Sequence, residues 1–366
     1  MAEQERSGSF SPRDVDVLVV GAGQAGLGTA YWLHRAARGV RLLVVDASSV
    51  GQSWLERWDS LTLFTPRRFS SLPGLHFPDG PGRTPSRTEM AAYLQTYAQH
   101  LDLPVETGVR VQRLTPQRCG FVAWTSTGPI HAAHVVIATG PFHRPNIPAA
   151  GRDLDPAVTQ LHSYHYRSPA DIPCGPVLVV GGGNSAAQLA LELAKTHPVT
   201  IASPGPPWFL PEDVAGVSMY WWMLLTGVLN AASGAQVSKY IRRRGDAIVG
   251  RQLRQLIRGG HVHLRPHRVV SAEGRQVGLA DGSSLTTSSV LWCTGYRPDT
   301  SWIQIAGVTD SAGAPLHHNG ASPMPGLHWM GLPWQTRLNS SIIDGVDRDA
   351  RRTARRILRA DERRSD

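Results

Sequence analysis

The chain has 366 residues, a hydrophobic fraction of 41% and a formal net charge of +9, which predict a globular protein long enough for two domains. Its three cysteines, Cys119, Cys174 and Cys293, lie far apart, which excludes a disulfide framework and a closely spaced redox pair. The basic residues form no stripe with interleaved aromatic side chains, and no residues have metal-ligand spacing, so we expect neither a nucleic-acid partner nor a metal site.

Residues 1–13 are polar and carry no secretory signal, so we expect them to be disordered and the protein to be cytoplasmic. From residue 14 to about residue 50, an apolar strand, a glycine-rich turn and a helix predict a β-α-β unit. In the turn, Gly21 permits a sharp bend, Gly23 lets the backbone approach a pyrophosphate, and Gly26 lets the helix pack closely on the sheet. The helix N-terminus, at Gln24 and Ala25, then favours the phosphate charges.

A second strand, residues 42–45, ends at Asp46, about twenty residues beyond the turn, as this fingerprint requires. The carboxylate is expected to accept hydrogen bonds from a ribose and to repel a 2′-phosphate. The first unit is therefore predicted to bind FAD or NAD rather than NADP; the alternative is a strand-turn-helix unit without a ligand.

The next part of the chain is less regular. Residues 51–88 are rich in Pro, Gly and aromatic side chains, and residues 89–101 predict a helix with Thr88 as a possible cap. Short strands are expected at 109–114 and 120–125, and a buried strand at 135–137 ends in Ala138-Thr139-Gly140. The proline-rich residues 141–148 predict a linker.

A second β-α-β unit is predicted over residues 176–202, with the turn Gly181-Gly182-Gly183-Asn184-Ser185-Ala186. Its second strand ends at Ser203, where no acid stands to repel a 2′-phosphate, so NADPH is favoured over NADH. The positive partner of that phosphate is left open. Arg242, Arg243 and Arg244 are candidates, and a solvated helix face is the alternative for them.

Helical segments are expected from about residue 213 to residue 257. The most apolar stretch, residues 219–229, is too short to span a bilayer and predicts a buried helix at a domain interface rather than a membrane-touching patch. A strand at 290–292 leads to Cys293-Thr294-Gly295, and a strand at 327–330 and a helix from 341 to about 358 follow. The arginine-rich run 347–366 predicts a solvated helix whose end, 361–366, is disordered.

The predicted fold class is α/β with two Rossmann-like dinucleotide-binding domains. Residues 14–150 and 291–360 form a discontinuous FAD-binding domain, and residues 160–290 form an inserted NAD(P)H-binding domain. Two dinucleotide sites in one chain indicate an oxidoreductase in which one cofactor passes electrons to the other.

The motifs, taken in order, resemble those of the flavin-containing monooxygenases. Within that family, the chain looks closest to the bacterial potassium-transport-associated flavoproteins. It also resembles the plant indole-3-pyruvate monooxygenases. The resemblance runs from about residue 15 to residue 357 and includes Gly51-x-Ser53-Trp54, residues 58–66 and 72–74, Thr294-Gly295-Tyr296 and residues 331–335. The chain departs from the family pattern at Pro156 and Val158, which precede a correctly placed His162, and at Ser203, where an arginine is common.

The resemblance implies a monooxygenase that uses FAD and NADPH and inserts one oxygen atom from O2 into a small organic substrate through a C4a-(hydro)peroxyflavin. Trp54, Thr65 and Gln335 are the residues expected beside the reacting part of the flavin. The expected cofactor contacts are Gly21, Gly23, Gln24, Ala25, Gly26, Asp46, Ser53, Trp54, Phe64, Thr65, Val111, Thr139, Gly140, His162, Gly181, Gly183, Asn184, Ser185, Ala186, Ser203, Thr294, Gly295, Gln335 and Ser341.

Two other functions are considered. The chain could be an NAD(P)H-dependent flavin reductase that passes electrons to a protein carrier, or a non-catalytic nucleotide-binding partner protein. The substrate, the type of oxygenation (N-hydroxylation, sulfoxidation, Baeyer-Villiger insertion or oxidative decarboxylation) and the oligomeric state are left open by the sequence.

Overall fold

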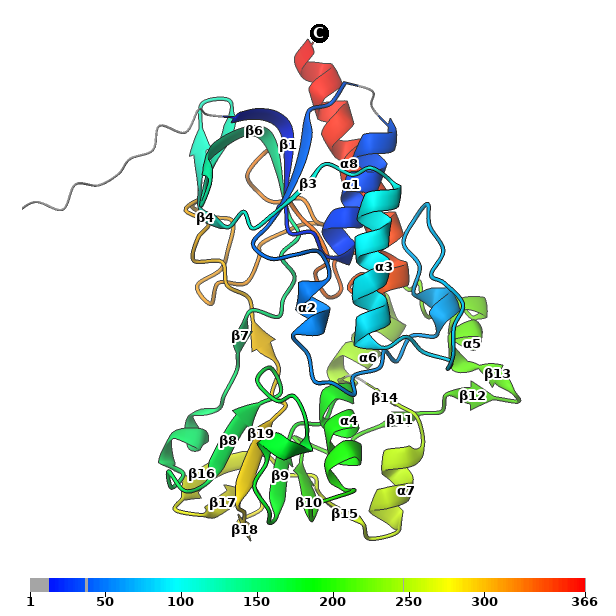
Figure 1. The fold of residues 1–366 in the computed structure, drawn as a ribbon, viewed down its shortest axis with the longest axis vertical. Coiled ribbons are helices and arrows are strands. Elements are labelled where there is room, and N and C mark those ends of the chain that lie inside the picture. Colours follow the sequence, from blue (N-terminus) through cyan, green and yellow to red (C-terminus); the bar gives the residue numbers. More distant parts are fainter. Residues whose placement is uncertain (1–12, 37–38, 246, 366) are drawn as a thin grey trace, which may run out of the picture.

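Two β-sheets, one mixed and one wholly parallel, organise the chain (Figure 1). The computed structural model describes residues 13–36, 39–245 and 247–365. The first sheet has the order β3-β2-β1-β6-β5-β4, and β21 pairs with the end of β6. Its strands are β1 (Arg13–Val20), β2 (Leu42–Asp46), β3 (Val105–Thr107), β4 (Val111–Gln117), β5 (Gly120–Thr125), β6 (Gly128–Ile137) and β21 (Leu327–Trp329).

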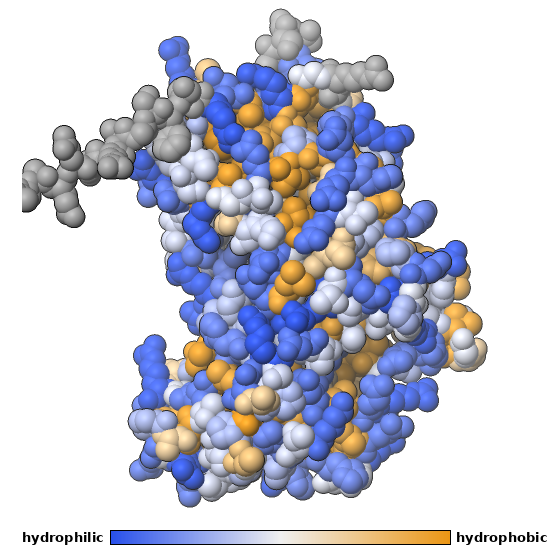
Figure 2. Space-filling model, viewed as in Figure 1, coloured by the Kyte–Doolittle hydropathy of each residue, from blue (hydrophilic) through white to orange (hydrophobic). Residues whose placement is uncertain are grey.

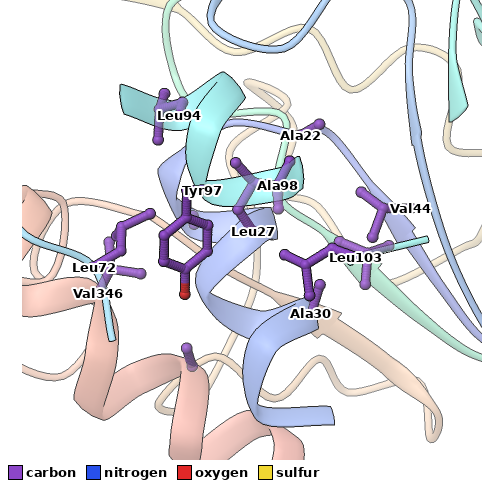
Figure 3. Close-up of a cluster of buried hydrophobic side chains, with 14 of the residues drawn as sticks. Ala22, Leu27, Ala30, Val44, Leu72, Leu94, Tyr97, Ala98, Leu103 and Val346 are labelled. Atoms are coloured by element: carbon purple, nitrogen blue, oxygen red, sulfur yellow. The ribbon is translucent and has the colours of Figure 1, made fainter. Parts of the chain in front are cut away.

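The first sheet is buried on both faces where it is parallel. Val17, Leu18 and Val19 of β1 are fully buried, as expected of a strand covered on both sides. Three helices pack on one face: α1 (Gln24–Ala36), α3 (Arg87–His100) and α8 (Ile343–Ser365). Figure 3 shows the core between them, with Leu27 and Ala30 of α1, Tyr97 of α3 and Val346 of α8 in one cluster.

The second sheet is wholly parallel, with the order β15-β10-β9-β19-β8. Its strands are β8 (Thr159–His162), β9 (Val177–Val180), β10 (Val199–Ala202), β15 (Val262–Arg265) and β19 (Ser289–Trp292), and α4 (Asn184–Leu193) and α7 (Gln252–Arg258) pack against it. In both sheets a glycine turn leaves the central strand, so the predicted fold of two Rossmann-like units is confirmed.

The chain crosses between the two sheets twice, and the two crossing segments pair with each other. The segment predicted as a linker contains β7 (Arg144–Pro145), which pairs antiparallel with β20 (Tyr296–Arg297). All strands of the second sheet lie between residues 159 and 292, whereas the first sheet takes strands from both sides of that range. The exact domain boundaries stay a prediction.

Smaller elements complete the fold. An antiparallel sheet of β16 (Val269–Glu273), β17 (Gln276–Leu279) and β18 (Ser284–Thr286) lies beside the second parallel sheet. Four short strands, β11 (Phe209–Leu210), β12 (Asp213–Val214), β13 (Val217–Ser218) and β14 (Ile248–Val249), accompany the helices α5 (Met219–Leu225) and α6 (Gln236–Arg244). The remaining helices are α2 (Gln52–Leu55) and the 3-10 turns η1 (Arg67–Phe69), η2 (Ala149–Asp153) and η3 (Pro169–Asp171).

The ends of two helices differ from the sequence prediction. Ser86, not Thr88, caps α3: its Oγ accepts the Glu89 N–H at 3.2 Å while the Glu89 carboxylate accepts the Ser86 N–H at 2.8 Å. α8 continues through residues 361–365, where the sequence predicts disorder, and His134 Nε2 lies 2.9 Å from Asp361. Arg13 belongs to β1, whereas residues 1–12 and 366 lie outside the described residues.

The predicted burial of the apolar stretch 219–229 is correct on one side only. Tyr220 and Leu229 are buried against Phe69, whereas Trp222 and Leu225 remain 39% and 74% exposed. α5 therefore packs by one face and leaves the other on the surface. Figure 2 shows polar residues over most of the viewed face, with apolar residues in scattered groups. Within the described ranges, no helix has the length and apolar character to cross a membrane.

Candidate active site

The first glycine turn contains two tightly packed glycines, Gly21 and Gly26, and one glycine that faces open space, Gly23. Gly21 has a φ of +106°, and a Cβ there would lie 2.6 Å from the Ala138 carbonyl oxygen. A Cβ on Gly26 would lie 1.8 Å from the Gly21 oxygen, so the packing of α1 on the sheet requires glycine. A Cβ on Gly23 would meet no protein atom within 4 Å. The turn therefore leaves room at Gly23, the position where a pyrophosphate approaches the backbone in this fold.

Asp46 is held at the carboxyl end of β2, beside this turn. Its carboxylate accepts the Ala22 N–H at 2.7 Å and the Ser48 N–H at 2.8 Å. A carboxylate has about four acceptor positions, so positions remain for ribose hydroxyls. The Asp46 carbonyl accepts the Val109 N–H at 2.8 Å, which brings the start of β4, at Val111, to the same edge of the sheet.

The second glycine turn repeats the arrangement. A Cβ on Gly181 would lie 2.4 Å from the Cys293 carbonyl oxygen, whereas a Cβ on Gly183 would meet nothing within 4 Å. No side chain caps the N-terminus of α4, so its first N–H groups can bind an anion. The Asn184 amide bonds to the backbone of Ala247 and Val249, at 2.9 and 3.2 Å, which leaves the backbone N–H of that residue for a phosphate.

Three predicted contact residues join the two crossings to one another. The Thr294 hydroxyl donates to the Asn146 carbonyl, and the Gly295 carbonyl accepts both the Asn146 N–H and His162 Nε2, each at 3.0 Å. His162 Nδ1 accepts the Tyr164 N–H at 3.1 Å. Burial lowers the pKa of His162 to about 4, so this imidazole is neutral at pH 7. Both of its nitrogens bond to the backbone of the protein. The Thr294 hydroxyl and the His162 ring therefore hold the crossing together, and their predicted cofactor contacts stay predictions.

A cavity opens at the carboxyl ends of β6 and β21. Thr139, Gly140, Trp302, Trp329 and Leu332 are among its lining residues. Gly140 has a φ of +76°, and a Cβ there would meet no atom within 4 Å. The sequence pattern Ala-Thr-Gly therefore ends in an open position beside a small void of about 10 Å³; the cofactor contact at Thr139 and Gly140 stays a prediction.

The residues predicted beside the flavin lie in different environments. Trp54 is half-buried against the α1–α3 core, Ser53 and Phe64 are exposed, and Thr65 is buried. Gln335 is turned inward: its Oε1 accepts the Leu332 N–H at 3.3 Å, and its Nε2 lies 3.5 Å from the sulfur of Met330. Gln335 therefore shapes the loop 331–335, in which Trp334 has the left-handed φ of +59°.

Sequence analysis missed two residues of this region. Tyr220 of α5 is buried against Phe69, and its hydroxyl lies near the Thr65 side chain. Asp344, in the first turn of α8 and three residues after Ser341, accepts from Asn339 Nδ2 at 3.1 Å, and burial raises its pKa to about 6. Its Oδ1 is buried without a hydrogen-bond partner among the described residues. An acid after Asn-Ser-Ser at a helix start was the available signal, but its burial is a tertiary effect.

Cysteine chemistry is not part of the candidate site. Cys119 and Cys174 are exposed free thiols. Cys293 is also free, and burial raises the pKa of its thiol to about 12. The thiolate is the reactive form of cysteine, so this geometry does not supply the paired thiols of a disulfide reductase.

Comparison with known proteins agrees with this geometry. The family described as pyridine nucleotide-disulphide oxidoreductase matches residues 18–224. The chain is 40% identical over 337 residues to an uncharacterized CzcO-like oxidoreductase of Geobacillus kaustophilus, covering 92% of this chain and 96% of that protein. It is 27% identical over 340 residues to the indole-3-pyruvate monooxygenase YUCCA1 of Oryza sativa, covering 83% and 82%.

Solved structures give the same result. The flavin-containing monooxygenase from Stenotrophomonas maltophilia superposes with a TM-score of 0.80 at 28% identity, covering 95% of this chain and 99% of that one. The similarity therefore includes both sheets and the crossings between them.

Proposed function

This chain belongs to the flavin-containing monooxygenases, within the pyridine nucleotide-disulphide oxidoreductase family, and we propose that it uses NADPH to reduce FAD and then inserts one oxygen atom from O2 into a small organic substrate. It is an oxidoreductase of the flavoprotein monooxygenase type, and FAD and NADPH are the cofactors that the family implies. The bound flavin supplies the electron transfer and oxygen activation; the protein binds, orients and shields it.

One observation carries the proposal. Gly23 and Gly183 both face open space at the N-terminus of a helix, and each helix follows a strand of a different sheet. We assign FAD to the first, with Asp46 on its ribose, and the nicotinamide nucleotide to the second, with Ser185 and the α4 N–H groups on its phosphates. The corresponding domains are residues 14–150 with 291–360, and residues 160–290.

Residues near Ser203 support NADPH over NADH. The Ser203 hydroxyl donates to the Gly205 carbonyl at 2.6 Å and is buried, so it is not free for a phosphate. Arg265 ends the neighbouring strand, its carbonyl accepts the Ser203 N–H at 3.1 Å, and its side chain is exposed. We assign the 2′-phosphate to Arg265, an arginine supplied by the next strand in place of the usual one.

Arg244 is the second candidate for the 2′-phosphate. Its guanidinium stacks on Trp208, in the loop after β10, at 5.3 Å from the ring centroid. Arg242 instead stacks on Trp334, 4.8 Å from that ring. All three arginines lie in the last turn of α6, but Arg242 and Arg244 stack on different rings, and Arg244 is the one beside the loop after β10.

Binding of adenosine 2′,5′-bisphosphate, compared with 5′-AMP, tests this assignment without turnover. We expect the wild type to prefer the bisphosphate and R265Q to bind it about thirtyfold more weakly, which corresponds to about 2 kcal/mol for a charged hydrogen bond. R254Q, which removes an exposed arginine of α7, is the matched control and should bind like the wild type. Equal affinity of R265Q and R254Q would refute the role of Arg265.

On the flavin side, we assign Trp54, Phe64 and Thr65 to the shielding of the isoalloxazine, and Gln335 to the positioning of the loop beside it. We assign Tyr220, whose hydroxyl lies near Thr65, to the support of that side chain. Asp344, whose pKa is raised to about 6 by burial, can hold a proton on Oδ1 near neutral pH. The reaction stays open between N-, S- and Baeyer-Villiger oxygenation and oxidative decarboxylation. 2-Oxo acids are tested first because plant relatives are named for indole-3-pyruvate.

A further inference from the structure

The helix α8 separates its charges by face. Four of its acidic side chains bond to other parts of the protein. Trp32 Nε1 donates to Asp347 at 2.7 Å and His134 Nε2 lies 2.9 Å from Asp361, while Asp344 and Asp349 accept from Asn339 and Thr336. Each of these carboxylates therefore has a partner outside α8.

The outer face of α8 is arginine alone over three turns. Arg348, Arg352 and Arg355 are exposed and make no hydrogen bond or ion pair with any residue in the described ranges. Residues spaced by three and four lie on one side of a helix. Arg352 and Arg355 also line a hollow with Arg356 and Arg359. From 348 to 359 this arginine face extends about 16 Å, at about 1.5 Å per residue.

This arrangement is unfavourable for the isolated fold. Like charges at i and i+4, as in Arg348 with Arg352 and Arg352 with Arg356, destabilise a helix. Arg356 is partly buried, and its Nη1 is enclosed without a partner among the described residues. Glutamine at these positions would keep the helix propensity and remove the repulsion. The stripe is therefore not explained by the folding of this chain.

We propose that the arginine face of α8 (Arg348, Arg352 and Arg355) docks an acidic protein segment that carries carboxylates at helical spacing. Guanidinium groups bind carboxylates by paired hydrogen bonds. Carboxylates at i, i+4 and i+7 of a partner helix repeat at the same interval as these arginines. The partner would relieve the repulsion, so its binding is favoured by the charge that destabilises the free helix.

Other occupants fit less well. No large apolar side chain is exposed on α8 within residues 343–362, so the face lacks the apolar anchors of a membrane-bound helix. It also has no exposed aromatic ring on which an unpaired base could stack. A second copy of this chain related by two-fold symmetry would bring the same arginines together. An acidic protein surface remains the occupant whose chemistry matches.

The test uses the full-length, flavin-loaded protein and a fluorescein-labelled helical peptide with glutamates at every third and fourth position, followed by fluorescence anisotropy. We expect the triple variant R348Q/R352Q/R355Q to bind the peptide about tenfold more weakly than the wild type, because three surface ion pairs are lost. The control R251Q/R254Q/R258Q removes the same charge at α7 and should bind within about twofold of the wild type.

Three results would overturn the proposal: no peptide binding by the wild type, equal weakening in the two triple variants, or a duplex DNA that binds more tightly through the same three arginines. Circular dichroism checks that α8 remains folded in each variant. NADPH reduction of the flavin, measured in parallel, tests the proposed function separately, because these arginines belong to neither assigned cofactor site.

Discussion

Alanine substitutions in the first glycine turn should separate cofactor binding from folding. In G26A the new Cβ would lie 1.8 Å from the Gly21 carbonyl oxygen, so α1 must move off the sheet. Overpacking of this kind costs about 3 kcal/mol or more. In G23A the Cβ meets no protein atom within 4 Å, and the fold loses only about 1 kcal/mol from a poorer helix start.

For G23A, the loss of FAD affinity should be larger than the loss of stability. The Cβ of G23A occupies the space assigned to the pyrophosphate and removes one or two hydrogen bonds to a charged group, each about 1.5–3 kcal/mol. FAD affinity should therefore fall at least about tenfold. The same reasoning applies to Gly183, where an added Cβ would meet no atom within 4 Å, and to Gly181, where an added Cβ would lie 2.4 Å from the Cys293 carbonyl oxygen.

The assay measures unfolding in urea on flavin-free protein and FAD binding by absorbance and flavin fluorescence. We expect G23A apoprotein to unfold near the wild-type midpoint while losing FAD, and G26A apoprotein to unfold at much lower urea. If G23A retained FAD fully, or if the two apoproteins were equally destabilised, the assignment of the open position to the pyrophosphate would be refuted.

Three further predictions follow from individual contacts. The folded-state pKa of Asp344, about 6 against an ordinary 3.8, means that its contribution to stability is present below pH 3.8 and lost as the pH rises to about 6. D344N should therefore be up to about 3 kcal/mol more stable than the wild type at pH 8 and no different at pH 4, by urea unfolding; a pH-independent difference would contradict this. S86A should lower the free energy of unfolding by about 1 kcal/mol because it removes the cap of α3, whereas T88A should have little effect; the opposite order would restore Thr88 as the cap. Y220F should lose about 1 kcal/mol of stability, because it removes the buried hydroxyl near Thr65, and should keep FAD bound; an unchanged urea midpoint would show that this hydroxyl makes no stabilising hydrogen bond.

Much of the fold could be predicted because glycine turns are local signals. Gly21 and Gly181 follow short buried strands, and the structure places them at the carboxyl ends of β1 and β9. The end of α8 could not be predicted, since its order depends on contact between Asp361 and the distant His134. Solvent exposure of α5 likewise depends on which face meets Phe69, a tertiary contact that the apolar composition does not reveal.

The site shows the same division between local pattern and tertiary contact. Backbone positions such as Gly23 and Gly183 were identified because their role requires a particular residue type. Side-chain roles were harder to predict. Asn184, His162 and Gln335 all carry suitable polar groups, but in the structure Asn184 and His162 bond other segments of the chain and Gln335 bonds within its own loop. The place of Arg265 beside Ser203 depends on the pairing of β10 with β15, which the sequence does not reveal.

Rapid mixing of oxygen with NADPH-reduced enzyme tests the central claim most directly. The protein is reduced with NADPH without air, mixed with O2, and followed by its flavin spectrum. The proposed monooxygenase activity predicts a distinct, persistent C4a-oxygenated flavin spectrum before the oxidised form returns, with NADPH reducing the flavin faster than NADH. Direct return to oxidised flavin with stoichiometric hydrogen peroxide, both with and without candidate substrates, would contradict it and indicate a reductase.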